Sequence, residues 1–277
     1  MENREVNLHT HTAVCKHGEG SIADYCRCAV TSGLKALGIS EHNAYPDDRL
    51  ISTRPFWQEM ETYFEELEEA KKRFPELTIL SALEVDVDEE FPLEFYRKEM
   101  LERFQLDYIF TGVHFVQDEK GNYIHVGLNS HLTIEAIRLF ARKTVRLMES
   151  GLFDFIAHAD FFCASVDEYT LEVEKCFREI LEASLRTGVV LELNAYGFRK
   201  KLCEYKDGSV RHPYPWEPFW KLAAEEYRIP FVCFSDAHKP CDVLGNVPEV
   251  IAYGEKLGMS CVNARLLEKI LKRKEGK

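Results

Sequence analysis

Seven short apolar runs recur along the chain, and longer stretches with helical patterning separate them. Each run is rich in Ile, Val, Leu or Phe, which predicts a strand that is buried on both faces. The runs are Glu5–Leu8, Ala36–Ile39, Thr78–Leu83, Tyr108–Val113, Phe153–Ala157, Val189–Leu193 and Pro230–Phe234. Buried strands that alternate with helices are typical of a parallel sheet covered by its own connecting helices.

The stretches between the runs contain helix start and stop signals. Ser21, Thr133 and Thr170 are suitable N-cap residues, and Gly33 and Gly188 can end the helices that follow the first and the third of them. We expect helices from 21 to 33, 56 to 73, 133 to 150, 170 to 187, 218 to 227 and 264 to 274. Seven strand–helix units favour a βα barrel over an open sheet, and no Gly-x-Gly-x-x-Gly follows the first strand to indicate a dinucleotide site.

Length and composition limit the function classes. The 277 residues suit one α/β barrel, and no Pro-, Gly- or Ser-rich linker divides them, so we expect residues 1–277 to form a single domain. The formal net charge of −12 argues against nucleic-acid or anionic-membrane partners. The nine Cys have no Cys-x-x-Cys spacing, and no signal peptide or membrane span is recognisable, so we expect a cytoplasmic protein with reduced thiols. No heptad or long apolar patch indicates an oligomeric state.

Polar side chains follow directly after each predicted strand. The segments are His9-Thr10-His11, Glu41-His42, Glu84-Val85-Asp86, His114, His158-Ala159-Asp160, Asn194 and Asp236-Ala237-His238. In a barrel the carboxyl ends of the strands converge on one mouth, so these residues should meet in space. Of the four His residues outside this pattern, His125, His131 and His212 are expected in loops or at helix caps.

The residue types at these strand ends indicate a metal site. Residues two apart on a strand share a face, so His9 and His11 should point together, as should Asp236 and His238. Imidazole and carboxylate ligands suit zinc, iron and manganese. One such pair would be weak evidence, but His follows five strand ends and Glu84 follows a sixth, and this combination predicts a metal centre at the mouth.

These segments, together with Cys15-Lys16-His17-Gly18, resemble the successive motifs of the PHP (polymerase and histidinol phosphatase) superfamily, from near residue 6 to about 245. The resemblance implies a distorted (β/α)7 TIM-like barrel with three divalent metal ions, zinc, manganese or iron, at its mouth. The implied ligands are His9, His11, Glu84 and Asp236 for the first metal, Glu84, His114 and His158 for the second, and His17, His42 and His238 for the third. Only the resemblance assigns a role to His17.

Within the superfamily, the sequence is most similar to the monofunctional histidinol-phosphate phosphatases. Residues 191–200 resemble their Asn-x-x-Gly-x-Arg-Lys segment, which implies that Arg199 contacts the substrate phosphate. By the same resemblance, Asn194 and His42 are expected to bind the substrate or its phosphate. Tyr196 stands where that motif has small hydroxyl residues, and a ring at this place should narrow or reshape the pocket.

The predicted activity is hydrolysis of a small phosphomonoester, L-histidinol phosphate in histidine biosynthesis, by a metal-activated hydroxide. Arg199 would clamp the phosphoryl oxygens, because its guanidinium is a planar fork with fixed charge. The leaving group would take a proton from Asp160, His238 or a metal-bound water, although Asp160 could instead orient a metal-bound His. The alternatives are a PHP phosphoesterase for a nucleotide, sugar phosphate or phosphotyrosine, and a non-catalytic metal-binding regulatory module.

Overall fold

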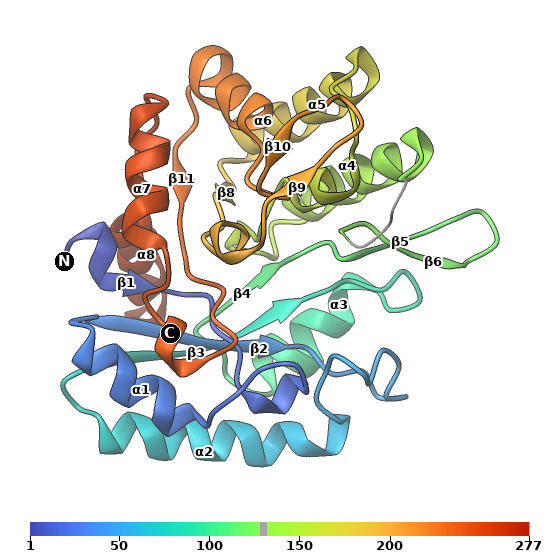
Figure 1. The fold of residues 1–277 in the computed structure, drawn as a ribbon. Helices are drawn as coiled ribbons and strands as arrows, with labels where there is room; N and C mark the ends of the chain where they lie inside the picture. The colour runs from blue at the N-terminus through green and yellow to red at the C-terminus, as the bar shows by residue number, and fades with distance from the viewer. Residues whose placement is uncertain (128–131, 277) are drawn as a thin grey trace.

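A curled sheet of seven parallel strands forms the centre of the molecule in the computed structural model, which describes residues 1–127 and 132–276. Its strand order is β1-β2-β3-β4-β7-β8-β11 (Figure 1). The strands are β1 Val6–Asn7, β2 Ala36–His42, β3 Thr78–Val85, β4 Tyr108–Thr111, β7 Phe155–Ile156, β8 Val190–Glu192 and β11 Phe231–Val232. Each overlaps one of the predicted apolar runs, so the seven predicted strands are confirmed.

The two end strands of the sheet approach each other beyond their carboxyl ends. Thr10, after β1, forms a parallel bridge with Ala237, after β11, and the backbone N–H of His11 donates to the carbonyl of Ala237 over 2.8 Å. The strand order follows the chain from β1 to β11, with two antiparallel hairpins inserted between sheet strands. The fold is therefore the predicted α/β architecture, a distorted TIM-like barrel.

Helices cover the outer face of the sheet, with α1 and α2 along one side and α7 and α8 near β1 and β11 (Figure 1). They are α1 Ile22–Thr31, α2 Met60–Arg73, α3 Leu93–Tyr96, α4 Ile134–Glu149, α5 Leu171–Thr187, α6 Glu217–Leu222, α7 Val247–Lys256 and α8 Asn263–Glu275. The hydroxyls of Ser21, Thr133 and Thr170 accept N-cap hydrogen bonds as predicted. The sequence did not predict α3 and α7.

Shorter turns complete these elements. Segments Arg97–Glu102 and Ala223–Tyr227 continue α3 and α6 as π-helical turns. The 3₁₀ turns are Asn3–Glu5, Ala13–Cys15, Trp57–Glu59, Phe161–Ser165, Tyr196–Arg199 and Pro240–Asp242. The helix expected from residue 56 therefore begins as a 3₁₀ turn and becomes α-helical at Met60.

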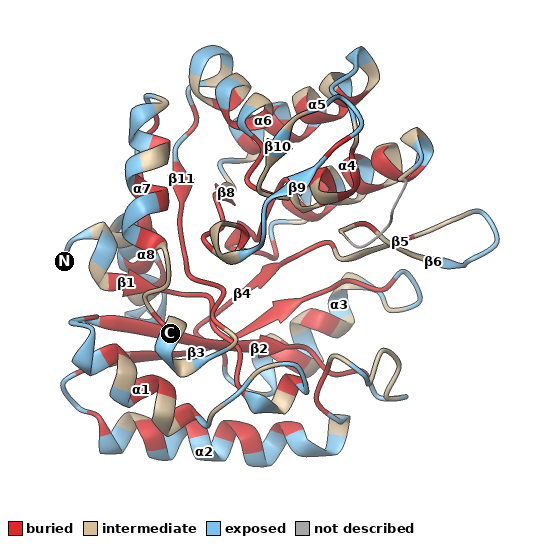
Figure 2. Cartoon of the chain, viewed as in Figure 1, coloured by how far each residue is buried: buried red, intermediate tan, exposed pale blue. Residues whose placement is uncertain are grey.

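Large side chains fill the interior of the barrel, so the strands are buried almost throughout (Figure 2). The rings of Phe110 and Phe155 stack at 4.2 Å, and the Tyr108 hydroxyl donates to the carbonyl of Leu8 over 2.6 Å. Gly38 makes room for Tyr108, because a Cβ at Gly38 would lie 1.8 Å from the tyrosine oxygen. Helix α8 packs against the same cluster beside β1, which closes the amino-terminal end of the barrel.

Two antiparallel hairpins, which the sequence analysis did not predict, follow strands of the sheet at their carboxyl ends. Strands β5 Phe115–Gln117 and β6 Tyr123–His125 follow β4, and β9 Cys203–Glu204 and β10 Val210–Arg211 follow β8. His131 lies outside the described residues. All nine Cys are unpaired, and six of them are buried. Among the described residues, every helix is too short or too polar to cross a membrane.

Candidate metal centre and active site

The residues predicted for the first metal lie together at the carboxyl ends of the strands. The Nε2 atoms of His9 and His11 are 3.0 Å apart. Oε2 of Glu84 lies 3.6 and 3.4 Å from these two nitrogens, and Oδ1 of Asp236 lies 3.5 Å from each of them. The four side chains are buried, so their ligand atoms face a common point that is shielded from bulk water.

Glu84 connects this group to a second one. Its Oε1 atom lies 2.9 Å from Nε2 of His158 and 3.9 Å from Nε2 of His114, whereas Oε2 faces the first group. Glu84, His114 and His158 are close enough to hold one ion between them. A carboxylate with each oxygen turned to a different group is placed to bridge two cations, as the resemblance implied.

The ligands implied for the third metal do not form one group in the structure but belong to two. His42 and His238 share a possible ligand group with His11, and His17 and His238 share another with Cys15. The Nε2 atoms of His17 and His238 are 3.0 Å apart. The structure therefore brings all nine predicted ligands to one mouth, and adds the Cys15 thiol beside them.

The cluster has the properties of a cation site. Two pairs of imidazole nitrogens face each other at 3.0 Å, and Nδ1 of His158 is buried without a hydrogen-bond partner among the described residues. Burial lowers the pKa of His42 well below its usual value and that of His238 to about 3, so both imidazoles are neutral. Neutral imidazoles beside carboxylates are the donor set of zinc, iron and manganese, and these residues fit such ions.

Buried Glu192, at the end of β8, orients two of the ligands. Its Oε1 atom lies 2.9 Å from Nδ1 of His9, and its Oε2 atom accepts hydrogen bonds from the backbone N–H of His158 and from Nδ2 of Asn194. Burial alone would lower the pKa of His9, but Glu192, Asp236 and Glu84 raise it. The sequence analysis did not single out Glu192, although its place at the end of a predicted strand, two residues before Asn194, was a usable signal.

Two further carboxylates lie next to His ligands, at longer distances than the one between Glu192 and His9. Oε1 of Glu41 lies 3.4 Å from Nδ1 of His11, and Oδ2 of Asp86 lies 3.3 Å from Nδ1 of His114. Arg54, itself buried, forms a 3.0 Å ion pair with Asp86. A carboxylate behind a ligand imidazole fixes the ring and its tautomer, and thereby strengthens metal binding.

A cavity of about 690 Å³ opens over the ligand cluster. Its lining combines ligands with cations and rings that lie outside the ligand set: Arg54, Lys200, Lys201, Phe115, His125, Phe161, Tyr196 and Tyr214. The ring of Tyr196 stacks on His238 at 5.4 Å, and Nζ of Lys200 lies 4.0 Å from the centre of that ring. Tyr196 thus lies in the cavity wall, where the sequence analysis placed it.

The sequence of this chain is similar to those of known proteins. The family model "PHP domain" matches residues 7–196, more than half of the chain. The chain belongs to the PHP domain family. A curated relative from Deinococcus radiodurans named "Probable histidinol-phosphatase" is 27% identical over 245 residues, which cover 85% of this chain and 86% of the relative.

Two solved structures share the PHP fold of this chain. A protein of Listeria monocytogenes assigned as the histidinol phosphatase HisK aligns with a TM-score of 0.70 at 21% identity, over 86% of this chain and 97% of its own. The histidinol phosphate phosphatase of Lactococcus lactis, in complex with zinc, L-histidinol and phosphate, aligns with a TM-score of 0.65 at 16% identity, over 93% and 95%. These likenesses confirm the barrel fold that the sequence predicted.

Arg199, the predicted phosphate clamp, lies next to the backbone that carries a ligand. Its guanidinium donates to the carbonyls of Ser235 and Asp236, the latter over 3.3 Å, and its Nε atom lies 3.7 Å from Asp242. Arg199 is not among the residues that line the cavity, whereas its neighbour Lys200 is. The predicted contact between Arg199 and substrate phosphate stays a prediction.

Asp160 and Asn194 are also turned to protein groups. The strand β7 ends at Ile156, and Oδ2 of Asp160 accepts from the backbone N–H of Trp216 over 2.6 Å and from Nε1 of Trp220 over 3.0 Å. Asp160 is fully buried and does not line the cavity, and burial raises its pKa to about 6. Asn194 donates to Glu192 and to Asp236, over 2.8 and 3.2 Å. Their proposed acid and substrate-binding roles stay predictions.

His125 differs from the loop or cap position expected of it, whereas His212 lies in the loop between β10 and α6, as expected. His125 lies on β6 and lines the cavity, and burial lowers its pKa to about 4. His212 stacks on Phe198 at 5.1 Å, beside the second hairpin. The sequence analysis could not place His125 at the site, because it lies on a hairpin that does not belong to the strand–helix pattern.

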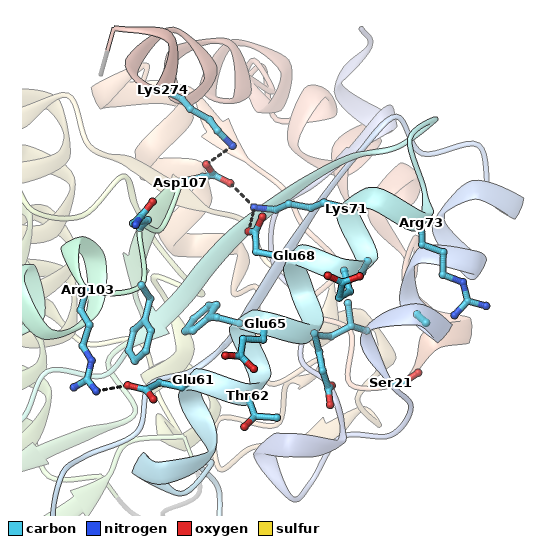
Figure 3. A pocket seen from close by; sticks show the side chains of 18 residues that line it. Ser21, Glu61, Thr62, Glu65, Glu68, Lys71, Arg73, Arg103, Asp107 and Lys274 are labelled. Atoms are coloured by element: carbon cyan, nitrogen blue, oxygen red, sulfur yellow. Dashed lines mark hydrogen bonds and ion pairs between the residues drawn. The ribbon is translucent and has the colours of Figure 1, made fainter.

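A larger hollow, of about 1230 Å³, lies elsewhere on the surface, over the outer face of α2 (Figure 3). Six of its charged side chains form ion pairs with one another. Arg103 contacts Glu61 at 2.6 Å, Lys71 contacts Glu68 at 2.6 Å, and Lys274 contacts Asp107 at 2.7 Å. This hollow includes none of the nine predicted metal ligands, so we place the chemistry in the smaller cavity above the His cluster.

Proposed function

We propose that this protein is a metal-dependent phosphomonoesterase that hydrolyses L-histidinol phosphate to L-histidinol and phosphate, a reaction of histidine biosynthesis. The observation that carries the proposal is the set of ligand groups joined through Glu84, His11 and His238 on the floor of a cavity with a cationic wall. Membership of the PHP family and the Deinococcus relative support a phosphoesterase. The Lactococcus structure, which holds L-histidinol and phosphate, supports this substrate.

The residues of this chain supply distinct parts of the proposed reaction. Three divalent ions of zinc, manganese or iron, when bound by the nine ligands, would lower the pKa of a water molecule and neutralise phosphoryl charge. Lys200 and Lys201 line the cavity and attract the dianionic phosphate, and Arg54 lies deeper, beside Asp86. Tyr196 covers His238 and excludes water from that side. His238 also lines the cavity, but its pKa of about 3 leaves the imidazole neutral, so we assign it to metal binding and not to proton donation.

A substrate panel tests this proposal. Purified protein loaded with zinc or manganese should release phosphate from L-histidinol phosphate faster than from nucleotide, sugar-phosphate or phosphotyrosine substrates. Equal or faster release from one of these others would overturn the substrate assignment but leave a phosphoesterase. Bound metal without release from any phosphoester would instead indicate a regulatory metal-binding module. Glu84→Gln removes the shared carboxylate and should lose both metal and activity, which ties the activity to this site.

A further inference from the structure

One side of the cavity is an aromatic wall formed by Phe115, His125, Phe161 and Tyr214. The ring of Phe161 lies 5.8 Å from that of His125 and 5.3 Å from that of Tyr214, and the Phe115 ring lies 4.8 Å from His125. All three contacts are edge-to-face, the arrangement that the quadrupoles of aromatic rings favour. The aromatic wall is thus a packed surface and not a set of isolated side chains.

Phe161 connects the aromatic wall to the metal-ligand cluster. Its ring lies 5.0 Å from His158 and 5.4 Å from His114, both in the second ligand group. Gly127 holds the other side of this ring, because a Cβ at Gly127 would lie 2.1 Å from the Phe161 ring. A planar group bound against the aromatic wall would therefore lie directly beside the place where phosphate is expected.

The charged side chains that line the cavity are not complementary in charge to an ammonium group. The cations are Arg54, Lys200 and Lys201, and the only carboxylates among the described lining residues are Glu84 and Asp236. Both of these lie among the His ligands, within 3.6 Å of His9. An amine on the substrate would meet like charges, and the described lining residues offer it no carboxylate outside the ligand cluster.

We propose, resting on the phosphatase function above, that this cavity selects its substrate by a planar ring and a phosphate, and that the amine contributes little. The aromatic wall takes the ring, with Phe161 as its central contact, and the ligand cluster and the lysines take the phosphate. The imidazole of histidinol phosphate is a ring of this class. Phe161 is accordingly a specificity-determining residue, because it contacts the ring in the part of the substrate that leaves as the alcohol.

Two simplified substrates distinguish the contribution of the ring to kcat/KM from that of the amine. Imidazolylpropyl phosphate keeps the ring and the phosphate of histidinol phosphate but lacks the amine, and aminopropyl phosphate keeps the amine but lacks the ring. For the zinc-loaded protein, we expect kcat/KM of the first to stay within about threefold of that for histidinol phosphate and that of the second to fall by about tenfold or more. An equal or larger loss for the ring-bearing compound would overturn the proposal.

A variant of Phe161 tests whether the aromatic wall causes the preference for a ring-bearing substrate. Phe161→Leu should raise KM for imidazolylpropyl phosphate by about tenfold and leave KM for aminopropyl phosphate unchanged. Phe95→Leu is the matched control, because Phe95 packs on Phe91 at 4.7 Å and does not line the cavity. Metal content is measured for each variant. Equal losses on both substrates with full metal would show a structural role and overturn the proposal.

The proposed phosphatase function can be wrong even if the proposed role of the aromatic wall is right. If wild-type protein with full metal releases phosphate from no ester, that function is wrong, and calorimetry with zinc-loaded protein then decides the inference. L-histidinol should bind at least about tenfold more tightly than aminopropanol, and Phe161→Leu should remove this difference. Equal affinity for the two alcohols in the wild-type protein would overturn the role of the aromatic wall.

Discussion

Oε1 of Glu192 lies 2.9 Å from Nδ1 of His9, and the two residues are 183 positions apart in the chain. Strand β8 thereby fixes a ligand that follows β1, across the interior of the barrel. The other oxygen of Glu192 accepts the backbone N–H of His158, so one buried carboxylate orients the first and the second ligand groups. We therefore expect the metal affinity of this protein to depend also on residues that do not touch the metal themselves.

Glu192→Gln should weaken metal binding by about 10- to 100-fold, because an amide holds the His9 ring in the required tautomer less well and does not increase its basicity. Metal retained after dialysis against graded chelator, with unfolding by heat as a check, measures the effect. Glu179→Gln, an exposed change on α5, is the control. Unchanged metal retention in the Glu192 variant would refute its orienting role.

Removal of metal should lower the melting temperature. The mouth gathers Glu84 and Asp236 with neutral imidazoles, and ions that bind only the folded state stabilise it by about 2.7 kcal/mol per site at 100 times Kd. For a chain of this size that corresponds to roughly 5–10 °C in Tm. Differential scanning calorimetry with zinc and with chelator measures the shift. In Glu84→Gln the shift should shrink; an undiminished shift would place the bound metal elsewhere.

Arg199→Ala distinguishes a clamp from a positioning residue. Because the guanidinium donates to the carbonyls of Ser235 and Asp236, we expect the variant to lose metal affinity by about tenfold or more, with Arg199→Lys intermediate. Metal analysis and KM, measured on the same preparations, separate the two roles. Full metal occupancy with a raised KM and a lowered kcat would support direct contact with the phosphate.

Asp160→Asn tests the proton donor. An Asn oxygen can still accept from the Trp216 N–H and the Trp220 indole, so the fold should persist, and we expect kcat within about threefold of wild type. Asp160→Ala leaves both donors buried without a partner and should cost about 2–4 kcal/mol of unfolding free energy. A fall in kcat of about 100-fold in the Asn variant would instead establish Asp160 as the acid.

Local patterns in the sequence determined the barrel and most of the ligand set. Buried parallel strands need continuous apolar runs, and N-caps need Ser or Thr, so both are visible in a short window of sequence. The ligands follow the runs because the carboxyl ends of all strands meet at one mouth. His17 is the exception, since no strand spacing placed it and only the family resemblance did.

Only the tertiary structure decided which groups surround those ligands. Glu192 and Asp86 reach ligands from other strands, and Arg199 and Asp160 turn to backbone and indole groups, contacts that no spacing along one strand encodes. Phe161 and His125 meet because a hairpin and a 3₁₀ turn pack together over the mouth. The sequence by itself determined where the candidate metal ligands lie, and long-range packing decided which groups surround them and which side chains line the cavity.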